Sequence, residues 1–289
     1  MPELPEVETI RRDLEKKITG EKIKNIEILA AKSIHNKSSD FTKVLVKNNF
    51  KHIERRGKLL MFALEKIEKY AYLLVHLKMT GQLICRNKKQ LLAGGHSQTG
   101  MNTIVPNKFT RVFFTFSDGS QLFFNDLRRF GYLKLVSHEE KEKIVTNNFG
   151  IEPLTPDYTL EAFEKLFKNR QTNIKALLLN QKLISGIGNI YADEICFCAK
   201  ILPTRKVSSL SILEIKKLFK CVEDVLRVAI ANRGTTFNNY VDSDGHIGSH
   251  INFLNAYGRD GEKCKRCKSI ILKMKHAGRG THYCPKCQK

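Results

Sequence analysis

The N-terminal residues carry the spacing of an amphipathic helix. Apolar side chains recur at Val7, Ile10, Leu14 and Ile18, with mostly polar residues between them. Residues three and four apart share one face of a helix. Pro5 suits the first helical position, and the neighbouring glutamates are favoured at the positive end of the helix dipole. The pattern predicts a helix over residues 5–18.

From residue 22 to about residue 136 the pattern changes to short apolar runs separated by polar turns. Runs of this kind are typical of strands, and seven of them in this length indicate a β-sandwich. Residues 87–108 are rich in Gly, Asn and Lys, which predicts a long mobile loop. The expected strands are residues 26–30, 59–64, 72–77, 82–85, 112–116, 121–124 and 132–136, with a hairpin turn at 117–120.

The second half of the chain has helical periodicity. Leu160, Phe163 and Phe167 share one face of a first helix. A capping box at residues 211–214 opens a longer helix that stops before Gly234. The fold class is therefore α+β and multidomain. The expected parts are a β-sandwich at 1–136, a polar linker at 137–158, a helical domain at 159–236 and a C-terminal segment at 237–289.

The composition adds a strong positive charge to this picture. Lys and Arg number 50 against 29 Asp and Glu, which leaves a net charge of +21 spread along the chain. Such a surface favours a polyanion, with nucleic acid first and an anionic membrane surface as the alternative. No apolar run is long enough to span a bilayer, and the acidic start is not a signal peptide. We expect a soluble, cytoplasmic protein.

Eight cysteines fall into two groups. Cys264, Cys267, Cys284 and Cys287 form two C-x2-C pairs separated by 16 residues, a spacing that suits four thiolates around one structural zinc ion. Two local disulfides or redox motifs are the alternative. The remaining cysteines are expected to be ordinary buried thiols. They are Cys85, Cys196, Cys198 and Cys221.

The N-terminus is a candidate nucleophile. Removal of the initiator Met before Pro2 would expose a secondary amine, and an α-amino group with a pKa near ~8 is partly unprotonated at neutral pH. Such an amine can attack a sugar C1′ and form an iminium ion. Glu3, beside it, could supply or remove protons. The alternative is that Glu3 and Glu6 are ordinary charges before a helix.

Three further segments place charged, aromatic or glycine residues at predicted turns. Residues 55–58 form a basic turn, and residues 125–131 present two arginines and a phenylalanine at a bend. Arginine with an aromatic ring can insert into a duplex and fill a vacated base position. The glycines of residues 185–189 would free backbone N–H groups for a phosphate. Each segment taken alone is also compatible with an ordinary surface turn or core packing.

Taken together, these segments resemble the bacterial formamidopyrimidine-DNA glycosylase family, essentially from end to end. The matching motifs are PELPEVET at 2–9, RRGK at 55–58, LRRFG at 127–131, GIGNIYA at 186–192 and AGRGTHYCPKCQ at 277–288. The resemblance implies an N-terminal β-sandwich with a leading helix, a helix–two-turn–helix domain and a C-terminal four-Cys zinc finger. These are the parts that the residue patterns also predict.

The resemblance implies base-excision repair of oxidised purines, chiefly 8-oxoguanine and formamidopyrimidines, followed by strand cleavage through β,δ-elimination. Pro2 would be the nucleophile that forms the Schiff base on the extruded nucleotide. Glu3 would be the adjacent acid/base and Glu6 a supporting carboxylate. Lys58 would contact phosphate and act in β-elimination, and Arg279 would serve δ-elimination and hold a phosphate.

The resemblance also implies a set of DNA contacts. One group fills the gap left by the extruded base, and a second group binds phosphate from the helix–two-turn–helix domain. The first group is Met79, Arg128 and Phe130, and the second is Asn189, Tyr191, Lys175 and, within about one residue, Arg170.

One stretch departs from the family pattern. The family usually has a Lys-His-Asp-His-like segment after the long loop, where this chain has KFTR at 108–111. Phe109 therefore replaces a DNA-contacting histidine. Arg111, two residues on, would share its strand face and is expected to supply the phosphate contact, the alternative being a solvated surface charge.

Two rival functions remain at this stage. Endonuclease VIII, a sister enzyme for oxidised pyrimidines, typically has Gly where this chain has Leu4, so Leu4 favours the purine enzyme. A non-catalytic zinc-ribbon protein that binds nucleic acid would explain the composition alone. The expected partner is damaged double-stranded DNA, and we expect a monomer with one structural zinc ion, no organic cofactor and no membrane association. In a bacterium its place would be the cytoplasm, on the nucleoid.

Overall fold

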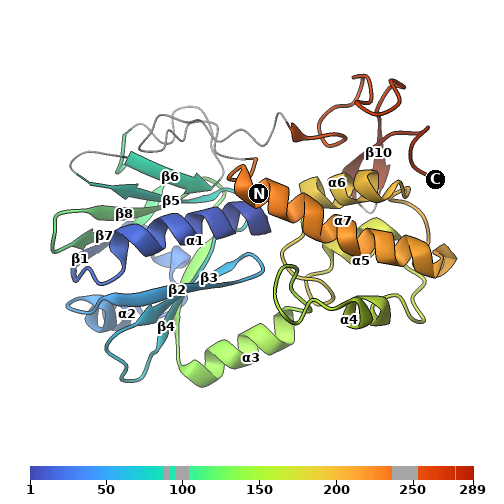
Figure 1. Cartoon of the computed structure of the whole chain (residues 1–289). Helices are drawn as coiled ribbons and strands as arrows, with labels where there is room; N and C mark the ends of the chain where they lie inside the picture. The colour runs from blue at the N-terminus through green and yellow to red at the C-terminus, as the bar shows by residue number, and fades with distance from the viewer. Residues whose placement is uncertain (88–90, 96–103, 236–252, 277) are drawn as a thin grey trace. The chain divides into compact units, whose positions relative to one another are not determined.

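The computed structural model describes residues 1–87, 91–95, 104–235, 253–276 and 278–289 (Figure 1). These residues form two compact units. The first comprises residues 1–145 and 232–235, and the second comprises residues 146–231 and the described part of 253–289. The predicted linker at 137–158 contains helix α3 (His138–Asn148).

The first unit is the predicted β-sandwich with a leading helix. One antiparallel sheet has the order β1-β7-β8-β5-β6 and the other has the order β2-β3-β4-β9. The strands are β1 (Ile23–Ile28), β2 (Phe50–Arg56), β3 (Leu59–Leu64), β4 (Tyr72–His76), β5 (Gly81–Arg86), β6 (Leu91–Gly95), β7 (Thr110–Phe116), β8 (Gln121–Asp126) and β9 (Tyr132–Val136). The core holds the buried aromatic rings of Phe41, Phe50, Phe62, Phe114 and Phe116.

Helix α1 (Leu4–Ile18) begins one residue before the predicted start and packs against this sandwich. Its face of Val7, Ile10, Leu14 and Ile18 is buried in the core, as the spacing predicts. A second helix, α2 (Ser38–Leu45), buries Phe41 and Leu45. The burial of the apolar face removes it from water and places the start of α1 beside the sandwich.

Strands β2 and β6 are absent from the sequence-based expectation. In β2 the charged residues Lys51, Arg55 and Arg56 hide the alternation that marks a strand. Strand β6 lies within residues 87–108, so that part of the predicted mobile loop is wrong. Residues 88–90 and 96–103 of the predicted loop lie outside the described residues.

The second unit is helical and ends in a two-stranded hairpin. Its core joins Phe163, Ile174, Tyr191, Leu218 and Leu226. The predicted capping box is present, because the backbone N–H of Ser211 donates to Glu214 Oε2 at 2.8 Å and Glu214 N–H donates to Ser211 Oγ at 3.3 Å. The elements are α4 (Leu160–Lys165), α5 (Ile174–Leu179), α6 (Asn189–Ala199), α7 (Ile212–Ala231), β10 (Leu272–His276) and β11 (Arg279–Tyr283).

The scattered cysteines differ from expectation in one pair. Cys85 and Cys196 are free and buried, as predicted. Cys198 on α6 and Cys221 on α7 form a disulfide, so the prediction of ordinary thiols is wrong for these two. The packing of α6 against α7 brings their Cα atoms to 5.8 Å, which is within disulfide range.

Gly234 packs directly against the start of α1. Its φ is +76°, and a Cβ built on it would lie 2.5 Å from Glu6 Oε1. Gly234→Ala should therefore combine backbone strain with a steric clash. We expect a loss of roughly 2–4 kcal/mol in the free energy of unfolding, measured by urea denaturation.

Gly119→Ala is the matched control. Gly119 has a φ of +85° with no atom within 4 Å of the added Cβ, so only the backbone cost of about 1–2 kcal/mol should appear. Equal losses in the two variants would show that the contact with Glu6 is not tight.

Candidate active site

The N-terminal amine lies in a buried, charged environment in the first unit. Burial lowers the pKa of the Met1 amine, the charges of Glu3 and Glu6 raise it, and the charge of Lys58 lowers it. Three of the predicted catalytic residues are therefore close enough to act on the amine electrostatically. Pro2, Glu3, Glu6 and Lys58 are all buried.

Glu6 is held by hydrogen bonds to both carboxylate oxygens. Its Oε2 accepts from the backbone N–H of Glu3 at 2.8 Å, and Glu3 in turn caps the first turn of α1. Its Oε1 accepts from the backbone N–H of Thr235 at 2.8 Å and from Thr235 Oγ1 at 3.2 Å. Glu6 is 0 % exposed, so this geometry suits a residue that positions the N-terminus.

The basic turn at 55–58 joins β2 to β3 and is fixed from α1. Arg55 Nε donates to Glu8 Oε2 at 2.9 Å and Arg55 also donates to the carbonyl of Gly57. Burial raises the pKa of Glu8, but hydrogen bonds from Arg11, Arg55 and Arg12 outweigh it and hold the pKa at about 2. Glu8 therefore stays ionised, and it anchors the turn that carries Lys58.

The three residues predicted to fill a vacated base position lie together on the sandwich. Met79 and Phe130 are 40 % and 53 % exposed, unusual for large apolar side chains. Arg128 donates to Met79 Sδ at 3.0 Å, and its guanidinium lies 4.7 Å from the centre of the Phe130 ring. Two loops far apart in sequence thus bring Met79, Arg128 and Phe130 together in one exposed cluster, called the wedge below.

The buried side chain of Asp126 supports this wedge through hydrogen bonds, a role that was not predicted from the sequence. The buried carboxylate accepts from Thr80 Oγ1 at 2.5 Å, from the backbone N–H of Arg128 at 3.2 Å and from that of Gly131 at 2.7 Å. These bonds join the loop of Met79 to the loop of Phe130. The available signal was an acidic residue between the apolar strand and the two arginines.

Arg111 does not have the surroundings expected of a phosphate contact. It is 6 % exposed, and its guanidinium donates to the carbonyl of Asp126 at 2.8 Å and to that of Lys108 at 3.2 Å. The side chain therefore ties its strand to the end of β8. The interpretation that Arg111 replaces the missing histidine is not supported.

In the second unit two of the predicted phosphate-binding side chains are buried. Lys175 is 0 % exposed; its Nζ pairs with Asp193 Oδ1 at 2.6 Å and donates to the carbonyl of Gly280 and to Thr281 Oγ1. Tyr191 is also 0 % exposed and packs in the helical core. Both side chains have internal partners or packing in this structure, and their part in phosphate binding stays a prediction.

Asp193 is the partner that the sequence analysis missed. One of its oxygens pairs with Lys175 and the other accepts from the backbone N–H of His282 at 2.9 Å. The network joins α5 and α6 to the strand that begins at Arg279. The signal in the sequence was an acidic pair, Asp193 and Glu194, inside an otherwise apolar helix.

The other predicted DNA contacts are half-buried or exposed. Asn189 opens α6 and donates from Nδ2 to the carbonyl of Gly280 at 3.1 Å, and its buried Oδ1 has no partner within the described part of the chain. Arg170 is half-buried and its Nε has no partner among the described residues. Arg279 is exposed at the start of β11.

The four predicted zinc ligands converge. The Sγ atoms of Cys264, Cys267, Cys284 and Cys287 all lie within 4.8 Å of one another. The distances between the sulfurs of Cys264 and Cys287 and of Cys267 and Cys284 are 3.9 and 3.4 Å. Four thiolates at Zn–S distances of ~2.3 Å require tetrahedral edges of about 3.8 Å, so the donor set fits a structural zinc ion.

The comparisons with known proteins agree along the chain. Family models match the formamidopyrimidine-DNA glycosylase N-terminal domain at residues 1–133, its H2TH domain at 149–240 and a zinc finger found in FPG and IleRS at 261–289. No helix among the described residues is long and apolar enough to cross a membrane.

Full-length relatives carry the same family name. The formamidopyrimidine-DNA glycosylases of Carboxydothermus hydrogenoformans and Pelotomaculum thermopropionicum are 41 % and 39 % identical to this chain. The alignments cover 100 % of this chain and 100 % and 99 % of the relatives, respectively.

Solved structures match equally well. A Lactococcus lactis Fpg in complex with DNA containing an abasic site has a TM-score of 0.85 and 35 % identity, with 99 % of both chains covered. The same protein with DNA containing N7-benzyl-Fapy-dG also has a TM-score of 0.85, with 100 % of both chains covered. The endonuclease VIII alternative is not favoured. The chain belongs to the formamidopyrimidine-DNA glycosylase family, and it is a base-excision repair enzyme for oxidised purines that combines DNA glycosylase and AP lyase activity.

Proposed function

We propose that the secondary amine of Pro2, exposed by removal of Met1, attacks C1′ of the damaged nucleotide. The observation that carries this proposal is the burial of Pro2 with Glu3, Glu6 and Lys58, whose charges act on the neighbouring amine of Met1. Burial disfavours the charged form of an amine, so a larger fraction is nucleophilic at neutral pH. The bond from C1′ to the oxidised base breaks as the amine bonds to C1′, and the leaving base takes up a proton. The amine loses its proton and the C1′–O4′ bond then breaks with proton transfer to O4′, which opens the sugar ring and leaves an iminium ion at C1′. Strand cleavage proceeds from this ion.

The neighbouring side chains carry out proton transfer, positioning of the N-terminus and the elimination steps. Glu3 transfers protons beside the amine, and Glu6 positions the N-terminus through its bonds to Glu3 and Thr235. Lys58 contacts phosphate and acts in β-elimination. Arg279, exposed on the terminal hairpin, holds a phosphate and serves δ-elimination.

DNA contacts complete the proposed site. A base inside a duplex is out of reach, so the enzyme extrudes it and pays the unstacking cost. The exposed wedge of Met79, Arg128 and Phe130 occupies the vacated space. Asn189 and Arg170 bind phosphate from the helical unit, with Asn189 at the positive end of the dipole of α6. The backbone N–H groups of Ser185 and Gly186 are not part of this contact, because they donate to the carbonyl of Ile151 and to Gln181 Oε1.

We also infer the working context of the enzyme. It acts on damaged double-stranded DNA as a monomer, with one structural zinc ion and no organic cofactor. The solved relatives bound to lesion-containing DNA support the choice of partner. Its place would be the bacterial cytoplasm, on nucleoid DNA.

Borohydride trapping tests the proposed function directly. Protein that begins at Pro2 should form a covalent adduct with a duplex containing 8-oxoguanine opposite cytosine. A duplex with an oxidised pyrimidine should trap at least about tenfold less, a difference of ~1.4 kcal/mol in transition-state binding. The adduct is measured by denaturing electrophoresis.

Protein that retains Met1 is the matched control, with its mass verified before the assay. It keeps every side chain but lacks the free secondary amine, so no adduct should form. Full trapping with Met1 retained would overturn the role of Pro2. Better trapping of the pyrimidine duplex would point to the sister activity instead.

Two substitutions should separate base excision from strand cleavage. Lys58→Ala should slow 8-oxoguanine excision, roughly 10²-fold, and slow cleavage of a preformed abasic site much less, because Pro2 still forms the iminium ion there and only the contribution of Lys58 to β-elimination is lost. Glu3→Gln should likewise lose excision more completely than lyase activity. Single-turnover rates on the two duplexes give the comparison, and equal losses in both assays would contradict separate proton-transfer roles.

Loss of zinc should remove DNA binding and leave the sandwich folded. Cys267→Ser takes one ligand from the thiolate set and should weaken binding to an abasic-analogue duplex by about tenfold or more, because the hairpin carries Arg279 and other cations. Zinc content and the dissociation constant are measured together. Cys85→Ser, a buried free thiol on β5, is the control and should change neither quantity.

A further inference from the structure

The disulfide between Cys198 and Cys221 is not used by the proposed mechanism. It joins α6 to α7 across 23 residues of sequence, and the two helices lie side by side in the helical unit (Figure 1). An enzyme that works on chromosomal DNA operates where thiols are kept reduced. Disulfides in that environment are usually transient or redox-sensing.

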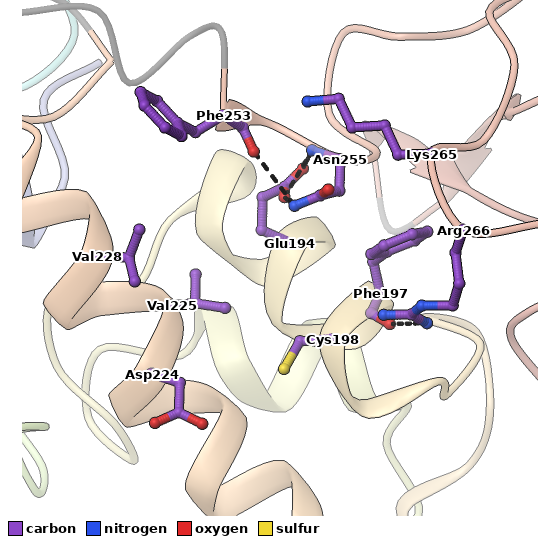
Figure 2. Close-up of a pocket in the computed structure, with 10 residues that line it drawn as sticks. All are labelled: Glu194, Phe197, Cys198, Asp224, Val225, Val228, Phe253, Asn255, Lys265 and Arg266. Carbon is purple, nitrogen blue, oxygen red and sulfur yellow. Dashed lines mark hydrogen bonds between the residues drawn. The ribbon is translucent and has the colours of Figure 1, made fainter.

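The two cysteines differ in exposure. Cys198 is half-buried and lines a cavity of about 430 Å³, where Figure 2 shows it beside Asp224 and Val225 of α7. Cys221 is 5 % exposed and is not among the residues that line that cavity. A small reagent entering the cavity would therefore meet Cys198 before Cys221.

The charges that line the cavity balance. Lys265 and Arg266 stand against the carboxylates of Asp224 and Glu194. Glu194 accepts hydrogen bonds from the backbone N–H groups of residues 255–257. The lining is therefore polar on one side and gives a small polar thiol hydrogen-bonding partners next to Cys198.

The disulfide also lies next to the base of the zinc finger. Phe197, the preceding residue, packs in a cluster with Ile271 and the zinc ligands Cys264 and Cys284. The guanidinium of Arg266 lies 4.4 Å from the centre of the Phe197 ring and donates to the Phe197 carbonyl at 3.2 Å. The end of α6 thus connects the cysteine pair with the hairpin that carries Arg279.

We propose that Cys198 and Cys221 form a reversible redox site, reached through the cavity by a low-molecular-weight thiol, that sets the stability of the helical DNA-binding unit. The expectation of a reducing compartment rests on the proposed function. The cavity and the cysteine pair are features of the structure and do not depend on that function.

The exchange balances without another reactant. The thiolate of the small thiol attacks Cys198 Sγ, the protein S–S bond breaks, and Cys221 leaves as a thiolate. A second small thiolate attacks the outer sulfur of the mixed disulfide and releases Cys198. The protein pair gains two electrons and two protons, and two small thiols become one small disulfide.

Equilibration of the zinc-loaded full chain in glutathione buffers tests the site. Alkylation and peptide mass mapping should show one two-electron transition of the 198–221 linkage. The oxidised form should unfold about 5–10 °C higher than the reduced form, because the bond restricts the unfolded chain. Neither readout requires glycosylase activity, so a failure of the proposed function would be seen separately.

Three variants complete the experiment. In Cys221→Ser the redox-dependent shift in unfolding temperature should disappear, and in Cys85→Ser it should remain. Oxidised glutathione should modify Cys198 in Cys221→Ser at least about tenfold faster than it modifies Cys221 in Cys198→Ser, since only Cys198 lines the cavity. The proposal fails if the linkage does not form, if it resists every reducing buffer, or if the two cysteines react at equal rates.

Discussion

The buried carboxylate of Glu6 is the constraint on which the proposed active site depends. It accepts hydrogen bonds from the backbone of Glu3 on one side and from Thr235 on the other, so it joins the start of α1 to residues 232–235. Gly234 permits the approach because any side chain there would overlap the carboxylate. An amine used as a nucleophile must be both exposed by processing and held in place, and Glu6 provides the second condition.

Each of the two units has a buried aspartate whose carboxylate joins separate segments of the chain. In the sandwich, Asp126 joins two loops and thereby supports the exposed wedge of Arg128 and Phe130. In the helical unit, Asp193 pairs with Lys175 and accepts from the backbone of His282. A buried carboxylate that loses its hydrogen-bond donors or its cation is left as an uncompensated charge. Each of these carboxylates therefore fixes where the neighbouring loops and strands can lie.

The basic side chains of this protein fall into two groups, those held by internal hydrogen bonds and those exposed on the surface. The net charge of +21 indicates a polyanionic partner, but it does not say which cations meet that partner. Lys175 and Arg111 are committed to internal hydrogen bonds, whereas Arg128 and Arg279 are exposed. The net charge alone therefore does not distinguish cations held by internal hydrogen bonds from exposed ones.

Features that depend on local spacing were predictable from the sequence. The face of α1, the capping box of α7 and the two cysteine pairs each rest on residues a few positions apart, and the structure has all three. The motifs likewise indicated the family and the candidate nucleophile. Strand β2 and the burial of Lys175 were not predictable, because they depend on partners distant in the sequence. The disulfide of Cys198 and Cys221 belongs to the same class, since nothing in the spacing of two scattered cysteines indicates that two helices will bring them within bonding distance.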